Sequence, residues 1–453
     1  MSTSGTLRFR PGAAYPFARL VRPSPETSGL LATAAPVAAM ALVNMCMSVT
    51  DTLMAAALGS VALATAGVTS DLYSIAFYIA IGVIGGLAPL YAAAHASGDA
   101  QRLARLRAAS WAVALAFGLP LAVAVWTSPG WLGALGIEPV LLDGGEGYAR
   151  AMALTFLPML AAGVLRTRLV AAERAASLFR VTLAAVPLNA GLNALLMFGI
   201  GGWPGLGLTG AGLSSFLVAC FTLVVFARLA RRSGDFGSVK TPDRKTVAEI
   251  LRLGFPIGIA TLSEVGVFLG ATLFVATLSV ADAAAHVLAI RVAGVTYAVS
   301  IGLLQATTVR MARAEADPAQ QRLIAGTSLR VSGIAALSVA AAVGLTAWPL
   351  SLTLSGEAAG IAAILLLLVA VSELAGPPGA AASGLLRGLR VTRLPMAISL
   401  VGNWLIAAPV GVALATAGGL GAPGMWIGLA AGSATVSTLT VLHLRRLLRR
   451  QNL

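Results

Sequence analysis

Charged residues are scarce in this chain: they make up 11% of its 453 residues, against about 25% in a soluble domain. Hydrophobic residues make up 58%, and the mean hydropathy is +0.89. Both values exclude an ordinary soluble domain and are typical of an integral membrane protein. One spanning helix needs about 20 apolar residues, so the length leaves room for about twelve spans joined by short loops.

Cysteine and histidine are scarce too. Cys46 and Cys220 both lie in apolar runs, which excludes a disulfide framework and favours small packed side chains. His95, His286 and His443 are too far apart in sequence for a zinc motif. We therefore expect no metal site and no cofactor. No catalytic constellation lies on one predicted helix face, so an integral membrane enzyme is the least supported alternative.

The first 26 residues carry four arginines and no apolar core of their own, so they predict an uncleaved first span and not a removable signal peptide. Twelve apolar runs follow. The expected spans are 30–58, 62–94, 109–128, 149–165, 181–200, 208–228, 251–278, 283–309, 331–353, 360–386, 395–417 and 424–443.

Basic residues alternate between the two sides of these spans. All of the 31 lysines and arginines except Arg150 and Arg291 fall in the two tails, the central linker and every second loop. The positive-inside rule places these segments, with both termini, in the cytoplasm of a cell (inner) membrane protein. The arginines form no continuous patch for nucleic acid. The expected parts are a cytoplasmic tail (1–28), an N-terminal lobe of six spans (29–230), a cytoplasmic linker (231–248), a C-terminal lobe of six spans (249–444) and a cytoplasmic tail (445–453).

The two halves of the chain resemble each other. A shift of 220 positions brings Pro36 onto Pro256 and Gly82 onto Gly302. Each half has an even number of spans, so the repeat is parallel, with a pseudo-twofold axis along the membrane normal, as in many transporters. We therefore predict an all-α membrane fold of two six-helix bundles. Pro36 and Pro256 interrupt the first span of each half; we interpret them as bending points for a conformational change, with a simple packing kink as the alternative.

A few ionisable groups lie at membrane depth: Asp51, Asp71, Glu264, Arg291 and Glu373. Such groups are costly in lipid, so they are expected to face protein or water, where a sheltered carboxylate can exchange a proton or a sodium ion. Asp71 and Arg291 are 220 positions apart, which predicts an ion pair between the halves. The alternative is that each is solvated separately in an open vestibule.

Asn189 and Asn193 are four residues apart on the fifth span and share one helical face. Ser214 and Ser215 begin the sixth span nearby. With Asp51, these side chains predict a site whose hydrogen bonds change on protonation. Two alternatives stay open: the amides are only contacts between helices, and Asp51 is solvated near a membrane surface.

Several stretches carry a resemblance to a known family: VTDTLMAAALGSVALA in the first span, PLNAGLNALLMFG in the fifth, GFPIGIATLSEVGVF in the seventh, AAAHVLAIRVAGV leading into the eighth and SGLLRGLRVTRLP after the tenth. In this order and spacing the chain resembles the multidrug and toxic-compound extrusion (MATE) family over nearly its whole length. The resemblance implies two six-helix lobes around a V-shaped cavity. It also implies export of cationic or amphipathic compounds, driven by inward flow of protons or sodium ions.

The same resemblance implies roles for single residues. Asp51 matches the first-span acid assigned to proton coupling, and Pro36 the kink proline of that helix. Asn189 and Asn193 match a polar pair, and Ser215 stands where members often have threonine. Glu264 matches the seventh-span acid of sodium-coupled members.

One position departs from the family pattern. The tenth-span acid of the sodium site aligns with Gly376, and Glu373, one turn away, is the residue that could replace it. This favours protons through Asp51 over sodium. The expected partners are small-molecule substrates and the lipid bilayer, and we expect a monomer.

Two other transporter classes stay open as alternatives. A flippase for lipid-linked saccharides, from the same wider superfamily, is expected to have a strongly basic cavity, whereas Arg291 is the lone basic residue at depth. A major-facilitator carrier also has parallel six-span halves, but the loop HASGDAQRLARLR is a poor match to its motif.

Overall fold

The computed structural model describes residues 24–134, 145–234, 241–275, 277–315 and 317–450. Nearly all of this part of the chain is helical, and it contains twelve helical segments long and apolar enough to cross a membrane, the number that the sequence predicts. Two of these segments are interrupted: the second consists of two helices, and so does the tenth.

The first half of the chain contains eight labelled helices. They are α1 (Pro25–Ala57), α2 (Ser60–Ile84), α3 (Leu87–Ala96), α4 (Ala100–Trp126), α5 (Ser128–Ala134), α7 (Glu146–Ala171), α8 (Ala175–Phe198) and α9 (Leu208–Arg232). The second half contains the remaining helices, one of them a short π-helix. They are α10 (Arg244–Val275), α11 (Val280–Arg313), α12 (Pro318–Ser351), α13 (Glu357–Glu373), α14 (Gly376–Gly388), α15 (Arg393–Leu400), η2 (Val401–Ala407), α16 (Ala408–Thr416) and α17 (Ala422–Arg450).

Several helices extend well beyond the apolar runs that mark them in the sequence. The third span begins at Ala100 and not at 109, because Asp99 caps α4 by accepting a hydrogen bond from the Arg102 backbone N–H at 2.8 Å. The ninth span begins at Pro318 and not at 331, with Asp317 as its cap. Hydropathy detects only the part of a helix that lies in hydrocarbon, whereas arginine-bearing turns continue the same helix into the polar layer.

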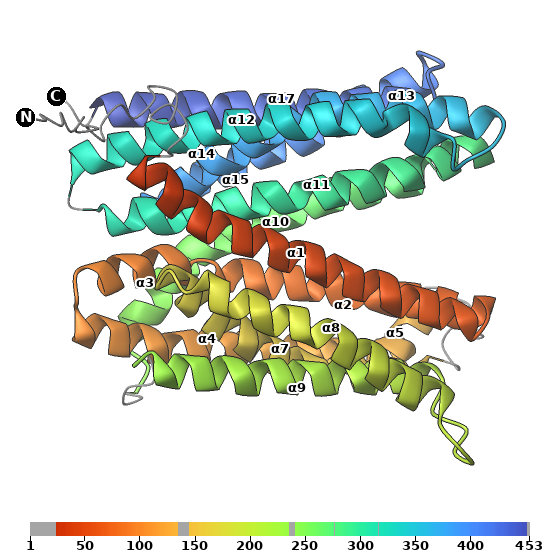
Figure 1. The fold of residues 1–453 in the computed structure, drawn as a ribbon, viewed down its shortest axis with the longest axis horizontal. Coiled ribbons are helices and arrows are strands. Elements are labelled where there is room, and N and C mark those ends of the chain that lie inside the picture. The colour runs from red at the N-terminus through yellow and green to blue at the C-terminus, as the bar shows by residue number, and fades with distance from the viewer. Residues whose placement is uncertain (1–23, 135–144, 235–240, 276, 316, 451–453) are drawn as a thin grey trace, which may run out of the picture.

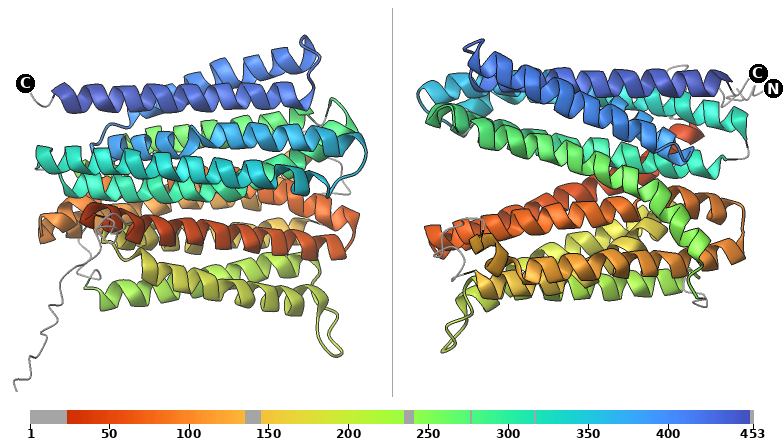
Figure 2. Two further views of the ribbon diagram at one scale, coloured as in Figure 1. Left: turned by 45° about the horizontal axis from the view of Figure 1, so that its top comes forward. Right: turned by 180° about the vertical axis from the view of Figure 1, so that it is seen from behind.

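The helices form two bundles, α1–α9 and α10–α17, which lie side by side (Figure 1). They touch mainly where α1 packs on α11 and α2 packs on α10. We call the end of the molecule where α1 begins and α17 ends the basic end, because the arginine clusters lie there. The bundles meet at the basic end and diverge towards the other end (Figure 2).

Glycines let α2 and α10 cross backbone to backbone. A Cβ added to Gly82 would lie 2.6 Å from the Gly258 Cα, and one added to Gly86 would lie 2.5 Å from the Gly254 N. The second span and α10 therefore each present two glycines four positions apart, Gly82 in α2 with Gly86 just before α3, and Gly254 with Gly258 in α10; this spacing brings helices into close contact in a membrane. This crossing joins the two bundles at the basic end.

The other crossing repeats this arrangement. A Cβ on Gly302 of α11 would lie 2.4 Å from the Ala34 carbonyl oxygen and 3.0 Å from the Ala38 Cβ of α1. Shifting Gly82 and Gly258 by 220 positions, forward and back, leads to Gly302 and Ala38. The internal repeat is thus visible in the contacts between the bundles as well as in the sequence.

Charged contacts between the bundles lie at the basic end. Arg310 of α11 bonds to Glu26 of α1 at 2.5 Å and to Glu173, beyond α7, at 3.4 Å. Arg310 and Glu26 are largely buried, with side chains 16% and 19% exposed. Arg102 of α4 bonds to Glu249 of α10 at 2.8 Å. Glycine crossings and ion pairs together hold the bundles against each other at this end.

Candidate functional site

Asp51 lies in the last two turns of α1 and contacts the asparagine pair of α8. The Asn193 amide nitrogen donates to Asp51 Oδ1 at 2.6 Å and lies 3.5 Å from Asn189 Oδ1. Both asparagines are fully buried, and they share a helix face because they are four residues apart. Asp51 is half-buried, so its carboxylate lies between packed amides and the interior space.

Of the two serines that begin the sixth span, Ser214 is the one that bonds to this cluster. Ser214 of α9 is fully buried, and its hydroxyl donates to the Asn189 backbone carbonyl at 3.3 Å. Ser215 is half-buried, and no hydrogen bond joins it to the cluster among the described residues. One residue corresponds to a rotation of about 100° on a helix, and the sequence alone did not establish how α9 is rotated.

The Asn193 side-chain oxygen is buried and has no hydrogen-bond partner among the described groups. An ionised carboxylate only accepts hydrogen bonds, so Asp51⁻ can satisfy the amide NH₂ but never the amide oxygen. A protonated Asp51 carries an O–H donor that can satisfy it. The pair therefore has a different best hydrogen-bond arrangement in each protonation state of Asp51.

Tyr148 of α7 is a member of this cluster that sequence reasoning missed. It is buried, lies close enough to Asp51 to interact with it electrostatically, and bonds through its hydroxyl to Ser70 at 2.9 Å. Nothing in the spacing of the sequence connects α7 to α1. A buried tyrosine on a spanning helix is a signal only because its hydroxyl needs a partner.

Glu264 lies on α10 of the other bundle. The Tyr297 hydroxyl of α11 lies near its carboxylate, and Arg387 of α14 is near enough to attract it. Tyr78 of α2 comes close to Tyr297 from the opposite bundle. Tyr78 and Tyr297 are 40% and 41% exposed, so the space between the bundles has aromatic walls beside an acid.

Glu373 ends α13 and is buried, with 8% of its surface exposed. Thr296 of α11 donates to its carboxylate at 2.5 Å. A Cβ at Gly376 would lie 3.5 Å from Glu373 Oε2 and 3.6 Å from Ser300 Oγ. The Glu373 carboxylate therefore lies beside the position from which an acid at 376 would extend. Glu373 contacts Thr296 and Glu264 lies near Tyr297, so two consecutive residues of α11 serve two different acids.

The remaining sequence candidates lie elsewhere. Pro36 and Pro256 lie inside α1 and α10, and Pro256 falls between the two glycines of the α2–α10 crossing. Arg291 is exposed on α11. The side chain of Asp71 lies outside the described part of the structure, so its ion pair with Arg291 stays a prediction.

His286 has a packing role. It is buried, accepts a hydrogen bond from the Trp426 indole at 3.1 Å and lies 3.0 Å from the Thr272 hydroxyl. Both of its ring nitrogens are thereby occupied. Within the described ranges no group of three or more His, Cys, Asp and Glu side chains could hold a metal ion.

Twelve spanning segments in two pseudo-symmetric bundles, with sheltered acids in each bundle, define a multi-pass membrane transporter. The MatE family model matches residues 36–195 and again 256–413. The two matches start 220 positions apart, at the two prolines, which confirms the repeat. The chain belongs to the MatE family, whose members are transporters, and it is not an enzyme.

Relatives cover nearly the whole chain. A probable multidrug resistance protein NorM of Bradyrhizobium diazoefficiens is 33% identical over 436 residues, 93% of each chain. The multidrug resistance protein NorM of Burkholderia vietnamiensis is 31% identical over 453 residues, 97% of this chain and 96% of the relative.

Solved structures confirm the fold. The eukaryotic MATE transporter AtDTX14 matches with a TM-score of 0.82 and 19% identity, over 94% of this chain and 99% of that one. A structure described as MATE in the bent conformation matches with a TM-score of 0.85 and 17% identity, over 97% and 98%.

Proposed function

We propose that the protein is a secondary active efflux transporter that exports cationic or amphipathic small molecules across the cell (inner) membrane in exchange for protons. The relatives named as multidrug resistance proteins support efflux. The positive-inside rule supports a cytoplasmic basic end, with both termini there. In that orientation the bundles are closed towards the cytoplasm, so the arrangement corresponds to an outward-facing state of a monomeric carrier.

The observation that carries the proton coupling is the Asp51–Asn193 pair. The 2.6 Å bond suits an ionised Asp51, and the unpartnered Asn193 oxygen suits a protonated one. On proton uptake the Asn193 amide turns, and its oxygen accepts the new Asp51 O–H. The change removes one negative charge from the bundle interior and reorganises the contact between α1 and α8.

Helix α1 connects this pair to the closed end. It carries Asp51 near one end, and Glu26 and Ala34, which contact α11, near the other. Pro36 lies just inside the crossing with α11 and lacks the N–H that would hold the preceding turn. A change at Asp51 can therefore bend α1 at Pro36 and loosen its contact with α11. Pro256 has the corresponding place in α10.

The substrate class follows from the walls of the central space. Glu264 supplies a carboxylate, and the exposed rings of Tyr78 and Tyr297 supply aromatic faces from both bundles. Cations are attracted to aromatic faces, with roughly 0.5–2 kcal/mol per contact depending on desolvation. Arg387 beside Glu264 places a second basic group in this region besides Arg291, contrary to the sequence expectation. The preference for a lipophilic cation over the phosphate of a lipid-linked saccharide, the substrate of the flippase alternative, therefore rests on the aromatic faces of Tyr78 and Tyr297.

Sodium coupling through Glu264 and Glu373 is the competing mechanism. Purified protein in liposomes separates the two: substrate efflux is measured under a pH gradient alone and under a sodium gradient alone. Wild-type protein should respond to the pH gradient, and Asp51→Asn should lose that response, because an amide side chain cannot take up and release the coupling proton.

The matched control is Glu357→Gln, an exposed acid in the first turn of α13. It should transport like the wild type. Efflux that follows the sodium gradient and ignores pH would contradict the proposal, and so would an Asp51→Asn variant with an intact pH response.

A further inference from the structure

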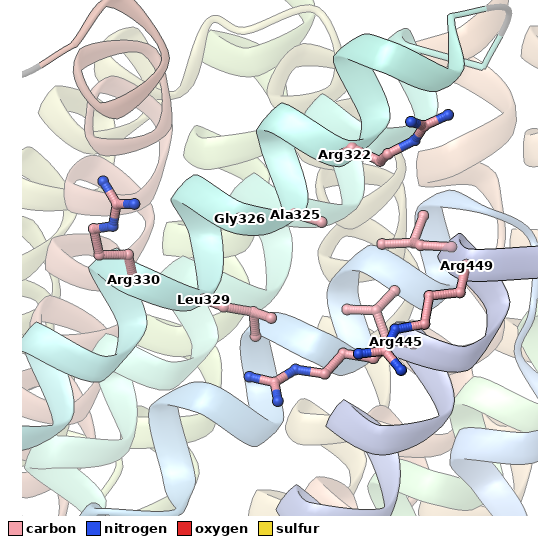
Figure 3. Close-up of a pocket in the computed structure, with 9 residues that line it drawn as sticks. Arg322, Ala325, Gly326, Leu329, Arg330, Arg445 and Arg449 are labelled. Atoms are coloured by element: carbon pink, nitrogen blue, oxygen red, sulfur yellow. The ribbon is translucent and has the colours of Figure 1, made fainter. Parts of the chain in front are cut away.

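A hollow lined by arginines lies at the basic end between α12 and α17. Its cavity volume is about 560 Å³. Figure 3 shows Arg322 and Arg330 on α12 at one side and Arg445 and Arg449 on α17 at the other. All four are exposed. The spacing places each pair on one side of its helix, because Arg322 and Arg330 are about two turns apart on α12, and Arg445 and Arg449 are about one turn apart on α17.

The floor of the hollow is apolar. Ala325 and Leu444 are buried beneath it, and the half-buried Leu329 and Leu448 border it. Gly326 lies between the two arginines of α12, and a Cβ there would meet nothing within 4 Å. The missing side chain leaves the hollow open. Four positive groups thus surround a pocket whose base is hydrocarbon.

None of the four arginines forms an ion pair or a hydrogen bond with a described residue. The positive-inside rule accounts for arginines at this end, but not for the position of four of them around one pocket. The other bundle provides the comparison. Its counterpart of Arg322 is Arg102, which is paired with Glu249, and its counterpart of Arg330 is Ser110. Within the described residues of the first bundle, the two positions that correspond to Arg322 and Arg330 therefore do not supply two unpaired arginines.

We propose that this hollow, the arginine pocket, binds the phosphate headgroup of an anionic phospholipid from the surrounding leaflet. Arginine binds phosphate oxygens in a two-pronged geometry, and basic pockets between spanning helices at the membrane surface suit such headgroups. The apolar floor favours a lipid over a free phosphate ion, because the acyl chains can continue along Leu329 and Leu448 towards the bilayer. The bound lipid would link α12 to α17.

Titration of purified, delipidated full-length protein tests the proposal, with bound lipid counted by native mass spectrometry. The probes are phosphatidylglycerol, phosphatidylcholine and inorganic phosphate. Each arginine near an anionic headgroup contributes roughly fivefold to affinity. The double variant Arg445→Gln/Arg449→Gln should therefore bind phosphatidylglycerol about 25-fold more weakly, with binding of phosphatidylcholine unchanged.

The matched control is Arg446→Gln/Arg450→Gln, which removes the same charge from the same exposed turns of α17 but outside the pocket. Its affinity should change less than about threefold. Gly326→Trp fills the hollow and removes no charge, and it should weaken binding by about tenfold or more.

Three outcomes would overturn the assignment. The first is an equal loss of phosphatidylglycerol affinity in the two arginine double variants, which would show that the effect comes from general surface charge. The second is unchanged binding of phosphatidylglycerol to the Gly326→Trp variant. This variant keeps the test decisive if an arginine variant fails to fold. The third is full displacement of phosphatidylglycerol by millimolar inorganic phosphate, which would make the site one for free phosphate.

Discussion

The contact between α2 and α10 allows a quantitative prediction for Gly82→Ala. The added Cβ would lie 2.6 Å from the Gly258 Cα, whereas ordinary contact begins at 3.4 Å, so the helices must separate by about 0.8 Å. Overpacking of this kind costs about 1–3 kcal/mol. Because the strain exists only while the bundles are closed at the basic end, that state should lose roughly 5- to 150-fold in population.

Distances between spin labels across the basic end measure this shift. Gln101 of α4 and Gln320 of α12 are exposed there, one in each bundle. They can be replaced by cysteine in a background without Cys46 and Cys220. Double electron–electron resonance should show mainly a short distance in the parent protein and an added longer distance in the Gly82→Ala variant.

Gly67→Ala is the control, because Gly67 lies on the same helix and its Cβ would meet nothing within 4 Å. Both substitutions favour the helix equally, so that effect cancels. Distance distributions that coincide for the two variants would refute the reasoning that the glycine crossing holds the closed state. Widening in the Gly67→Ala variant would refute it too.

The remaining predictions concern a cross-bundle ion pair and an acid. Arg310→Gln breaks its 2.5 Å contact with Glu26 and should widen the same label distance, because a largely buried charged hydrogen bond contributes about 1.5–3 kcal/mol. Arg150→Gln, which removes an ion pair with Glu146 inside α7, should leave the distance unchanged; equal widening would contradict a cross-bundle role for Arg310. Glu373→Gln should leave pH-driven efflux from liposomes close to the wild-type level, because the proposed proton route runs through Asp51 and Glu373 belongs to the competing sodium route. A loss of pH-driven efflux in this variant would contradict that assignment and place Glu373 in proton coupling.

Much of the architecture could be predicted from the sequence because its causes are local. A helix crosses the bilayer when about 20 consecutive residues are apolar, and this property needs no tertiary contact. The positions of the acids at membrane depth, and the repeat of Pro36 and Gly82 at Pro256 and Gly302, could be read in the same way. Helix ends were less predictable, since α4 and α12 continue into arginine-rich turns that hydropathy does not detect.

The partners of the acids could be predicted only in part. Asn193 contacts Asp51, but Ser214 and Tyr148 complete that cluster, and Tyr297 and Thr296 place hydroxyls near Glu264 and Glu373. These contacts depend on how each helix is rotated and which helices are neighbours. In a membrane that choice comes from many weak packing contacts between distant parts of the chain.

The sequence by itself determined the number of spans, the repeat, the sidedness of charge and the acids held at depth, because each follows from the transfer of single segments between water and lipid. Only the tertiary structure decided which ends of the bundles meet, that Gly82 and Gly258 touch, and that four arginines from two distant helices surround one pocket. Those features depend on the close approach of surfaces far apart in sequence, which no local property of the chain specifies.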